Sequence, residues 1–171
     1  PALWTSIITG KLPEKHGVLS FYHSTRPHAR CLSLYEILNG VNGNIGLFRW
    51  FATWPPVRNT GFTVPSRVAR SPETHPAKLR FLNDLTHLTD CRDYLKGGLR
   101  LVQHSARLST LVKCVAEVVY ETITRPEQRE WLHRRQQIET AIYTDVFVHL
   151  LREHRPQFAA VLYSIIDNVG H

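Results

Sequence analysis

Two short apolar segments limit the folds that this chain can adopt. Residues 44–51 contain Ile45, Leu47 and Phe48, and residues 158–166 form a second apolar run. Runs of this length are typical of strands buried on both faces of a parallel sheet. Because helical patterns precede the first run and fill much of the chain between the two, the order of the segments predicts an α/β fold with a mostly parallel sheet.

The helices near the start of the chain are predicted from the residues at their ends. Residues 5–9 are expected to form a short helix that stops at Gly10. Ser33 is placed to cap a helix over residues 34–38, whose apolar residues follow helical spacing. Residues 52–75 are rich in Pro, Arg and Thr and are expected to form a long surface loop.

The middle of the chain has a helical pattern. Apolar residues repeat at helical spacing over residues 105–123, and again from Pro126 to about His154. We therefore expect residues 76–155, approximately, to be a helical insertion or cap between two strands of one sheet. The whole of residues 1–171 is expected to belong to one domain.

The composition excludes some classes of protein. Hydrophobic residues make up 43% and charged residues 20% of the chain, as in ordinary globular domains. No apolar run approaches the roughly 20 residues of a membrane-spanning helix. The formal charge of +7 is compatible with nucleic acid, but the basic residues are dispersed, and Arg134 and Arg135 alternate with Glu130 and Glu139. Such mixing is typical of a solvated helix face, so no nucleic-acid partner is expected.

The three cysteines indicate thiols rather than a disulfide framework. Cys31, Cys91 and Cys114 are widely spaced, and no Cys-x-x-Cys pair is present. The odd number and the spacing also disfavour a zinc knuckle. We expect reduced or buried side chains at these positions.

The last five residues contain two side chains that commonly bind metals. Asp167 follows the second apolar run, and His171 comes four residues later. Parallel α/β sheets bind ligands beyond the carboxyl ends of their strands, and Gly170 permits a close backbone approach. A carboxylate and an imidazole suit zinc or another divalent transition metal. The same spacing also occurs in proteins that bind no metal, so the pattern alone is weak.

Two segments together resemble one enzyme family. The first is Trp4 to Val18, reading Trp-Thr-Ser-Ile-Ile-Thr-Gly-Lys-Leu-Pro-Glu-Lys-His-Gly-Val, and the second is Asp-Asn-Val-Gly-His at 167–171. They resemble the segment after the nucleophile and the Asp-x-x-Gly-His metal element of type I phosphodiesterases and nucleotide pyrophosphatases. The resemblance is dense over residues 3–19, recognisable over about 32–68 and renewed over about 156–171. It implies a partial α/β/α sandwich of the alkaline-phosphatase-like superfamily.

The resemblance implies a metal-dependent hydrolase with two divalent metal ions, zinc being the expected species. Asp167 and His171 match two ligands of one metal. The Ser or Thr nucleophile falls immediately before Pro1, and the other ligands fall upstream and downstream, so no catalytic residue is expected within the chain. Both ends are then expected to be cut inside an active site, and residues 1–171 alone are expected to be inactive.

Other candidate residues receive structural or alternative interpretations. Thr5, Ser6 and Thr9 follow the nucleophile position and are expected to satisfy backbone groups of their own helix. His16 is expected to order its turn rather than to bind metal. Trp54 either stacks on a nucleobase, sugar or aryl group of the substrate or packs to anchor its loop.

The favoured function is hydrolysis of a small-molecule phosphate ester. A sulfatase is an alternative in the same superfamily, although the Cys/Ser-x-Pro-x-Arg pattern of sulfatases is missing. A phosphoglycerol or phosphoethanolamine transferase is another. Outside these enzymes, the chain could be a non-catalytic paralogue that uses the fold for binding, or a basic nucleic-acid module whose binding would depend steeply on salt.

Overall fold

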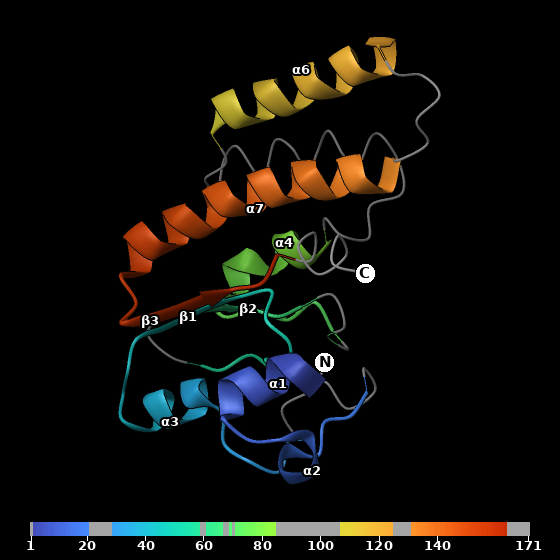
Figure 1. The fold of residues 1–171 in the computed structure, drawn as a ribbon. Helices are drawn as coiled ribbons and strands as arrows, with labels where there is room; N and C mark the ends of the chain where they lie inside the picture. The colour runs from blue at the N-terminus through green and yellow to red at the C-terminus, as the bar shows by residue number, and fades with distance from the viewer. Residues whose placement is uncertain are drawn as a thin grey trace.

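A parallel sheet with the strand order β2-β1-β3 forms the centre of the protein (Figure 1). The computed structural model describes residues 2–20, 29–58, 61–66, 69, 71–84, 107–124 and 131–163, with the backbone alone at 84, 118, 121–123 and 131–136. The strands are β1 (Ile45–Phe48), β2 (Phe62–Val64) and β3 (Phe158–Val161). Both outer strands pair with β1 in parallel. The predicted α/β class is therefore confirmed.

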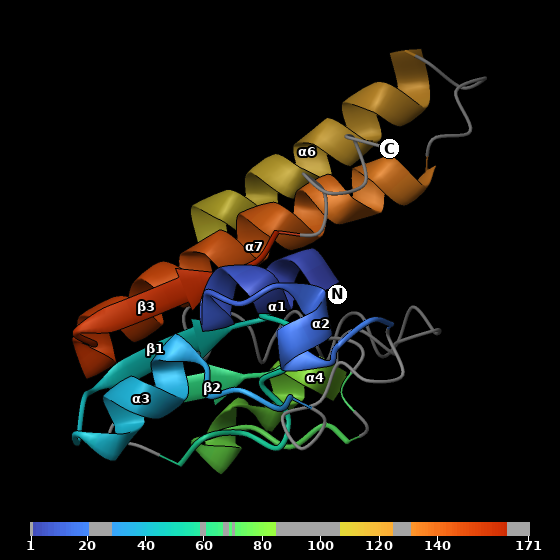
Figure 2. The ribbon, with the colours of Figure 1, turned by 60° about the horizontal axis from the view of Figure 1, so that its bottom comes forward.

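Helices cover both faces of this sheet (Figure 2). Side chains alternate along a strand, so Ile45 and Leu47 of β1 point to one face and Phe48 to the other. On the first face lie α1 (Ala2–Thr9) and α3 (Leu34–Gly40). On the second face lie α7 (Trp131–His154), the 3₁₀ helix η3 (Ala77–Arg80) and α4 (Phe81–Asp84). The result is a three-layer α/β/α arrangement.

The predicted end of α1 and the predicted start of α3 are confirmed. α1, however, begins at Ala2 rather than at residue 5, and α3 continues to Gly40 rather than ending at residue 38. α1 stops at Thr9, and Gly10 has a positive φ of 64°, which a glycine adopts without steric cost. Ser33 caps α3 by a reciprocal arrangement in which its hydroxyl accepts from the backbone N–H of Glu36, while Glu36 accepts from the backbone N–H of Ser33 at 2.8 Å. Between them lies a one-turn helix, α2 (Pro13–His16), which ends at Gly17 with φ 75°.

The expectation of a surface loop over residues 52–75 is wrong. This segment contains β2, and Phe62, Thr63 and Val64 are completely buried. The short Phe-Thr-Val strand lies between Gly61 and Pro65, in a region whose Pro, Arg and Thr content is otherwise typical of a loop. The tertiary environment of β1, rather than local composition, makes these residues a strand.

The two long helices differ in how far they are buried. The second half of α7 enters the core, where Val146, Phe147 and Leu150 pack against Phe48 and Phe62. These contacts confirm the apolar stripe predicted for this part of the helix. This half of α7 is one of the layers that cover the sheet. The expectation that residues 76–155, approximately, are a helical insertion or cap stays a prediction.

α6 (Leu108–Thr124) packs on α7 and carries the other predicted stripe. Cys114 is buried, and this burial, followed by the nearby Glu117 and Asp145 carboxylates, raises the pKa of its thiol. Most of the predicted apolar stripe, however, lies on the exposed side of α6. None of the helices in the described ranges is long and apolar enough to cross a membrane.

Candidate functional site

The start of α1 lies at the edge of the sheet toward which the three strands point (Figures 1 and 2). Trp4, in the first turn of α1, makes an edge-on contact with Trp50, the second residue after β1, with ring centroids 5.5 Å apart. Ile8, one turn further along the helix, packs in the same cluster as Ile45 at the beginning of β1. α1 therefore runs antiparallel to the strands, from their carboxyl ends toward their amino ends. Open α/β sheets bind ligands at this carboxyl edge.

The predicted metal ligands Asp167 and His171 lie outside the described residues. The chain leading toward them is described as far as residue 163. There Leu162 donates its backbone N–H to Phe48 O at 3.0 Å, and Tyr163 and Thr144 share a hydrogen bond of 3.0 Å between their hydroxyl groups. The end of β3 thus lies beside the end of β1. Among the residues that the structure describes, no group of three or more His, Cys, Asp or Glu side chains could hold a metal ion.

A buried cation lies where β1 ends. Arg49 is only 6% exposed and has a positive φ of 61°, which is rare for a residue other than glycine. Its guanidinium carbon lies 4.8 Å from the centre of the Tyr143 ring, and its Nη1 donates to Asn83 Oδ1 at 3.5 Å. Sequence reasoning missed Arg49; the signal was a charged residue directly after an apolar strand. It places positive charge at the carboxyl edge.

A second feature of this edge is the indole N–H of Trp50. Its Nε1 atom is buried and, within the described structure, has no hydrogen-bond partner. Leaving a buried donor unpaired costs about 1–3 kcal/mol, and such groups often mark a functional position or a bound water. Trp50 and Arg49 are adjacent in the sequence, so both polar groups belong to the exit from β1.

His16 orders the turn after α1, as predicted. It is completely buried, and its Nδ1 accepts the backbone N–H of Val18 at 3.1 Å. A nitrogen that accepts carries no proton, so the neutral ring is protonated on Nε2, which donates to Ser6 Oγ at 3.0 Å. His16 is therefore not placed to remove a proton from Ser6. Thr9 has a structural role as well, because its hydroxyl donates to Thr5 O at 2.7 Å.

Trp54 is held in its loop by a hydrogen bond. Its Nε1 donates to Ser71 Oγ at 2.9 Å, and the residue is partly buried. These contacts correspond to the loop-anchoring interpretation of Trp54. Its predicted stacking on a substrate stays a prediction.

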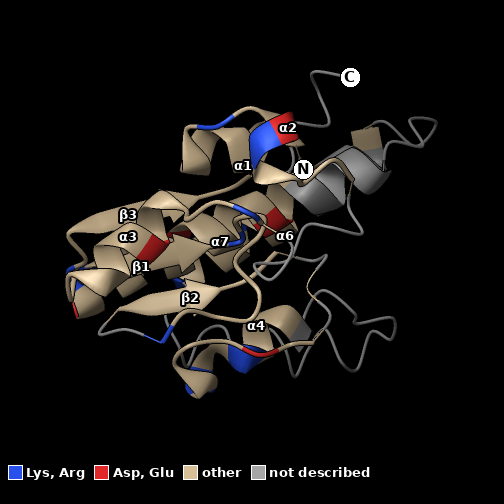
Figure 3. Ribbon diagram, turned by 90° about the horizontal axis from the view of Figure 1, so that it is seen from below, with Lys and Arg blue, Asp and Glu red and all other residues tan. Residues whose placement is uncertain are grey.

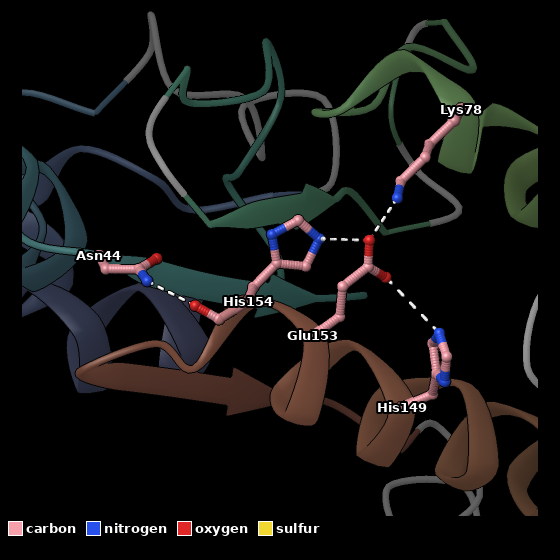
Figure 4. Close-up of polar contacts among 5 residues, drawn as sticks. All are labelled: Asn44, Lys78, His149, Glu153 and His154. Atoms are coloured by element: carbon pink, nitrogen blue, oxygen red, sulfur yellow. Dashed lines mark hydrogen bonds and ion pairs between the residues drawn. The ribbon is translucent and has the colours of Figure 1, made fainter.

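A polar cluster of five residues lies at the opposite edge of the sheet (Figure 4). Lys78 Nζ contacts Glu153 Oε1 at 2.5 Å, while His149 and His154 approach the same carboxylate at 3.5 and 4.0 Å. The hydrogen bond from Lys78 is the main reason that the pKa of Glu153 is lowered. Asn44, directly before β1, donates to His154 O at 2.6 Å. The cluster lies at the amino ends of the strands. We therefore interpret it as a set of structural contacts that hold η3 and α7 against the sheet.

The charged residues are spread over several elements of the described structure (Figure 3). Lys15 lies on α2, Lys78 and Arg80 lie on η3, and Arg152 lies near the end of α7. This distribution differs from the continuous basic face that typically follows a nucleic-acid backbone.

The described residues define an α/β fold whose candidate site lies at the carboxyl edge of its parallel sheet. The chain was compared with family models, with curated proteins and with solved structures, and none of the three comparisons gave a match.

Proposed function

We propose that this chain forms part of the catalytic domain of a metal-dependent phosphate-ester hydrolase, of the phosphodiesterase or nucleotide-pyrophosphatase type. The contact between Trp4 and Trp50 is the observation that carries the proposal. In the resemblance, the Ser or Thr nucleophile immediately precedes Pro1, next to the start of α1. Because Trp4 is close to Pro1 in the sequence, its contact with Trp50 supports a nucleophile near the carboxyl edge of the sheet. Asp167 and His171 come after β3 in the sequence, and β3 pairs with β1.

The residues of this chain have distinct parts in the proposed site. Asp167 and His171 are expected to bind one of two divalent ions, with the remaining ligands supplied by a longer chain. When bound, such ions offset phosphate charge and make a Ser or Thr hydroxyl more nucleophilic. Arg49 adds a fixed positive charge that favours an anionic substrate at the same edge. The hydrogen bonds of His16 keep the turn after α1 in place.

The proposal is tested with a longer chain that includes the residue before Pro1 and the sequence beyond His171. We expect it to hydrolyse an aryl phosphodiester, to lose this activity with a chelator and to regain it with zinc. Asp167→Asn is expected to lower kcat/KM by at least about 100-fold, as expected for loss of a metal ligand. Residues 1–171 alone are expected to show no turnover.

The matched control is Glu153→Gln, which changes a carboxylate at the opposite edge of the sheet. It should leave kcat/KM within about twofold, because Glu153 lies at the amino ends of the strands. Activity that survives both the chelator and Asp167→Asn in a folded protein would contradict the proposal. Turnover of sulfate esters, or transfer to an acceptor alcohol in place of water, would assign the site to one of the alternative enzymes.

A further inference from the structure

We infer that α6 is a self-association surface through which two copies of this chain pair in antiparallel orientation. Four aliphatic residues on one side of this helix remain in contact with solvent. Leu108, Val112, Val115 and Val119 are 66%, 59%, 63% and 51% exposed. A row of exposed aliphatic side chains on a helix commonly marks an interaction site.

The spacing of the row favours another helix as the partner. The four residues are separated by four, three and four positions, which is the spacing of the inward-facing residues of a coiled coil. The spacing is the same when it is read from either end. A two-fold antiparallel pair therefore brings Leu108 of one copy opposite Val119 of the other, and Val112 opposite Val115. A surface that is complementary to itself in this way fits a symmetric dimer.

The charges of α6 favour a second copy in particular. The row contains no charged residue, and the small residues Ser109 and Ala116 lie beside it and permit a close approach. Among the described side chains of α6, the charged ones are Lys113 and Glu117, whose charges cancel. The whole chain has a formal charge of +7. Two copies that meet at α6 therefore avoid the like-charge repulsion that other surfaces would produce.

α6 is held in position before any pairing takes place. Cys114 is buried on the opposite side of the helix, and the backbone N–H of Arg107 donates to Asp145 Oδ2 of α7 at 3.1 Å. The pair thus forms without the cost of forming a helix from an unfolded segment. One row of four residues is smaller than a standard interface, so we expect a weak dimer with a Kd on the order of 10–100 μM.

The described structure has a second exposed apolar surface, which supplies the control. It is divided between two short helices, with Ile7 on α1, Ile37 on α3 and Val41 directly after α3. Neither helix is long enough to repeat the four-three-four spacing. Ile37 is 52% exposed, close to the values for the row on α6, so a charge introduced there is a matched change outside the proposed interface.

The experiment is sedimentation equilibrium of the 171-residue chain from about 1 to about 500 μM, a range that brackets the expected Kd. The wild type should change from monomer to dimer within this range. Val112→Glu combined with Val115→Glu should weaken the association at least tenfold, whereas Ile37→Glu should leave it within about twofold. Circular dichroism checks that each variant is folded. The Val112→Ser, Val115→Ser variant replaces the Glu variant if the latter is unfolded.

A mixing experiment tests the antiparallel orientation. Leu108→Glu and Val119→Lys should each weaken self-association, but the two variants should associate with one another more tightly than either does with itself. The reason is that position 108 lies opposite position 119 of the other copy only in the antiparallel pair. The inference is overturned if the wild type is a monomer at every concentration, or if Ile37→Glu weakens the association as much as the double Glu variant does. It is also overturned if Leu108→Glu and Val119→Lys associate with one another no more tightly than each does with itself. Binding of the row to another part of a longer, monomeric chain would overturn it as well.

Discussion

At the residue scale, the two nitrogens of the His16 ring have different roles. Nδ1 accepts from Val18 N two residues ahead, which closes a tight turn, while Nε2 connects the turn to Ser6 on α1. The imidazole is completely buried, so the bond to Val18 N is shielded from water, and the bond to Ser6 is partly shielded. A buried polar group that is satisfied on both sides fixes a local conformation, and its removal leaves its partners unpaired. The loop that follows α1 therefore depends on one side chain.

His16→Ala should lower the free energy of unfolding by about 2–4 kcal/mol, because it removes both hydrogen bonds and leaves a cavity. His16→Asn should cost less, since the asparagine Oδ1 can accept from the backbone N–H two residues ahead as Nδ1 does. Ser6→Ala alone should cost about 1 kcal/mol, and it should add little in the His16→Asn background. Urea denaturation of the four variants measures these differences. If His16→Ala and His16→Asn lowered the free energy of unfolding equally, the hydrogen bond from Val18 N to the side chain at position 16 would contribute nothing to stability.

At the element scale, the end of α1 and the start of α3 were predictable, and the edge strand β2 was not. Gly10 and Ser33 act on their own helices through bonds to residues a few positions away, so a local pattern was sufficient. β2 has only three residues and depends on the neighbouring β1, which no local pattern contains. The same reason explains why two features were missed: Arg49, and the Trp50 Nε1 atom, which has no hydrogen-bond partner among the described residues. Their importance comes from the surrounding burial rather than from a sequence motif.

The pairing of β1 and β2 gives a prediction for Gly61. A Cβ atom at this position would lie 2.0 Å from Ile45 O, so a side chain would push the strands apart. We expect Gly61→Ala to lower the free energy of unfolding by about 2–4 kcal/mol. Gly40→Ala is the control, because a Cβ at Gly40 in α3 meets nothing within 4 Å. It should be neutral or stabilise by up to about 1 kcal/mol. Similar urea midpoints for Gly61→Ala and Gly40→Ala would contradict the expected clash between a side chain at position 61 and Ile45 O.

The ion pair between Lys78 on η3 and Glu153 on α7 predicts that stability depends on pH. The pKa of Glu153 is lowered from 4.5, mainly by the hydrogen bond from Lys78. The carboxylate therefore stabilises the fold above pH 4.5, and this contribution disappears as the pH falls through the lowered pKa. The Glu153 and Lys78 side chains are 38% and 51% exposed, so screening keeps the effect small, at about 0.2–1 kcal/mol.

Thermal unfolding of Glu153→Gln between neutral and strongly acidic pH tests this sign. The variant should be slightly less stable than the wild type near neutral pH, and the difference should vanish once the wild-type carboxylate is protonated. Lys78→Gln should reproduce the loss, and the double variant should lose no more than either single variant. High salt should reduce the difference as well. A difference that grows on acidification would exclude a stabilising ion pair.

At the scale of the whole molecule, α7 connects a buried part of the described structure with a more exposed part. Its second half is built into the core against the sheet, where Val146 and Leu150 are each only 1% exposed. α6 reaches the rest of the described structure through α7 and leaves much of its apolar surface in water. The carboxyl edge with Trp4, Arg49 and Trp50 belongs to the better-packed part. The candidate site therefore lies beside the buried layers of the fold, as a site that requires accurate positioning should.

This difference predicts the pattern of amide hydrogen exchange. With the chain kept dilute enough to be monomeric, amides of α6 should exchange at least about 30-fold faster than those of residues 142–151, since opening α6 exposes little additional apolar surface. Val146→Ala should accelerate exchange in α7 and in β1 together, because both depend on one core. Val112→Ala, on the exposed side of α6, should leave β1 unchanged. Equal protection of α6 and α7 in the wild type would mean that the helical pair and the sheet open as one cooperative unit, and that α6 is more firmly attached than its exposed residues indicate.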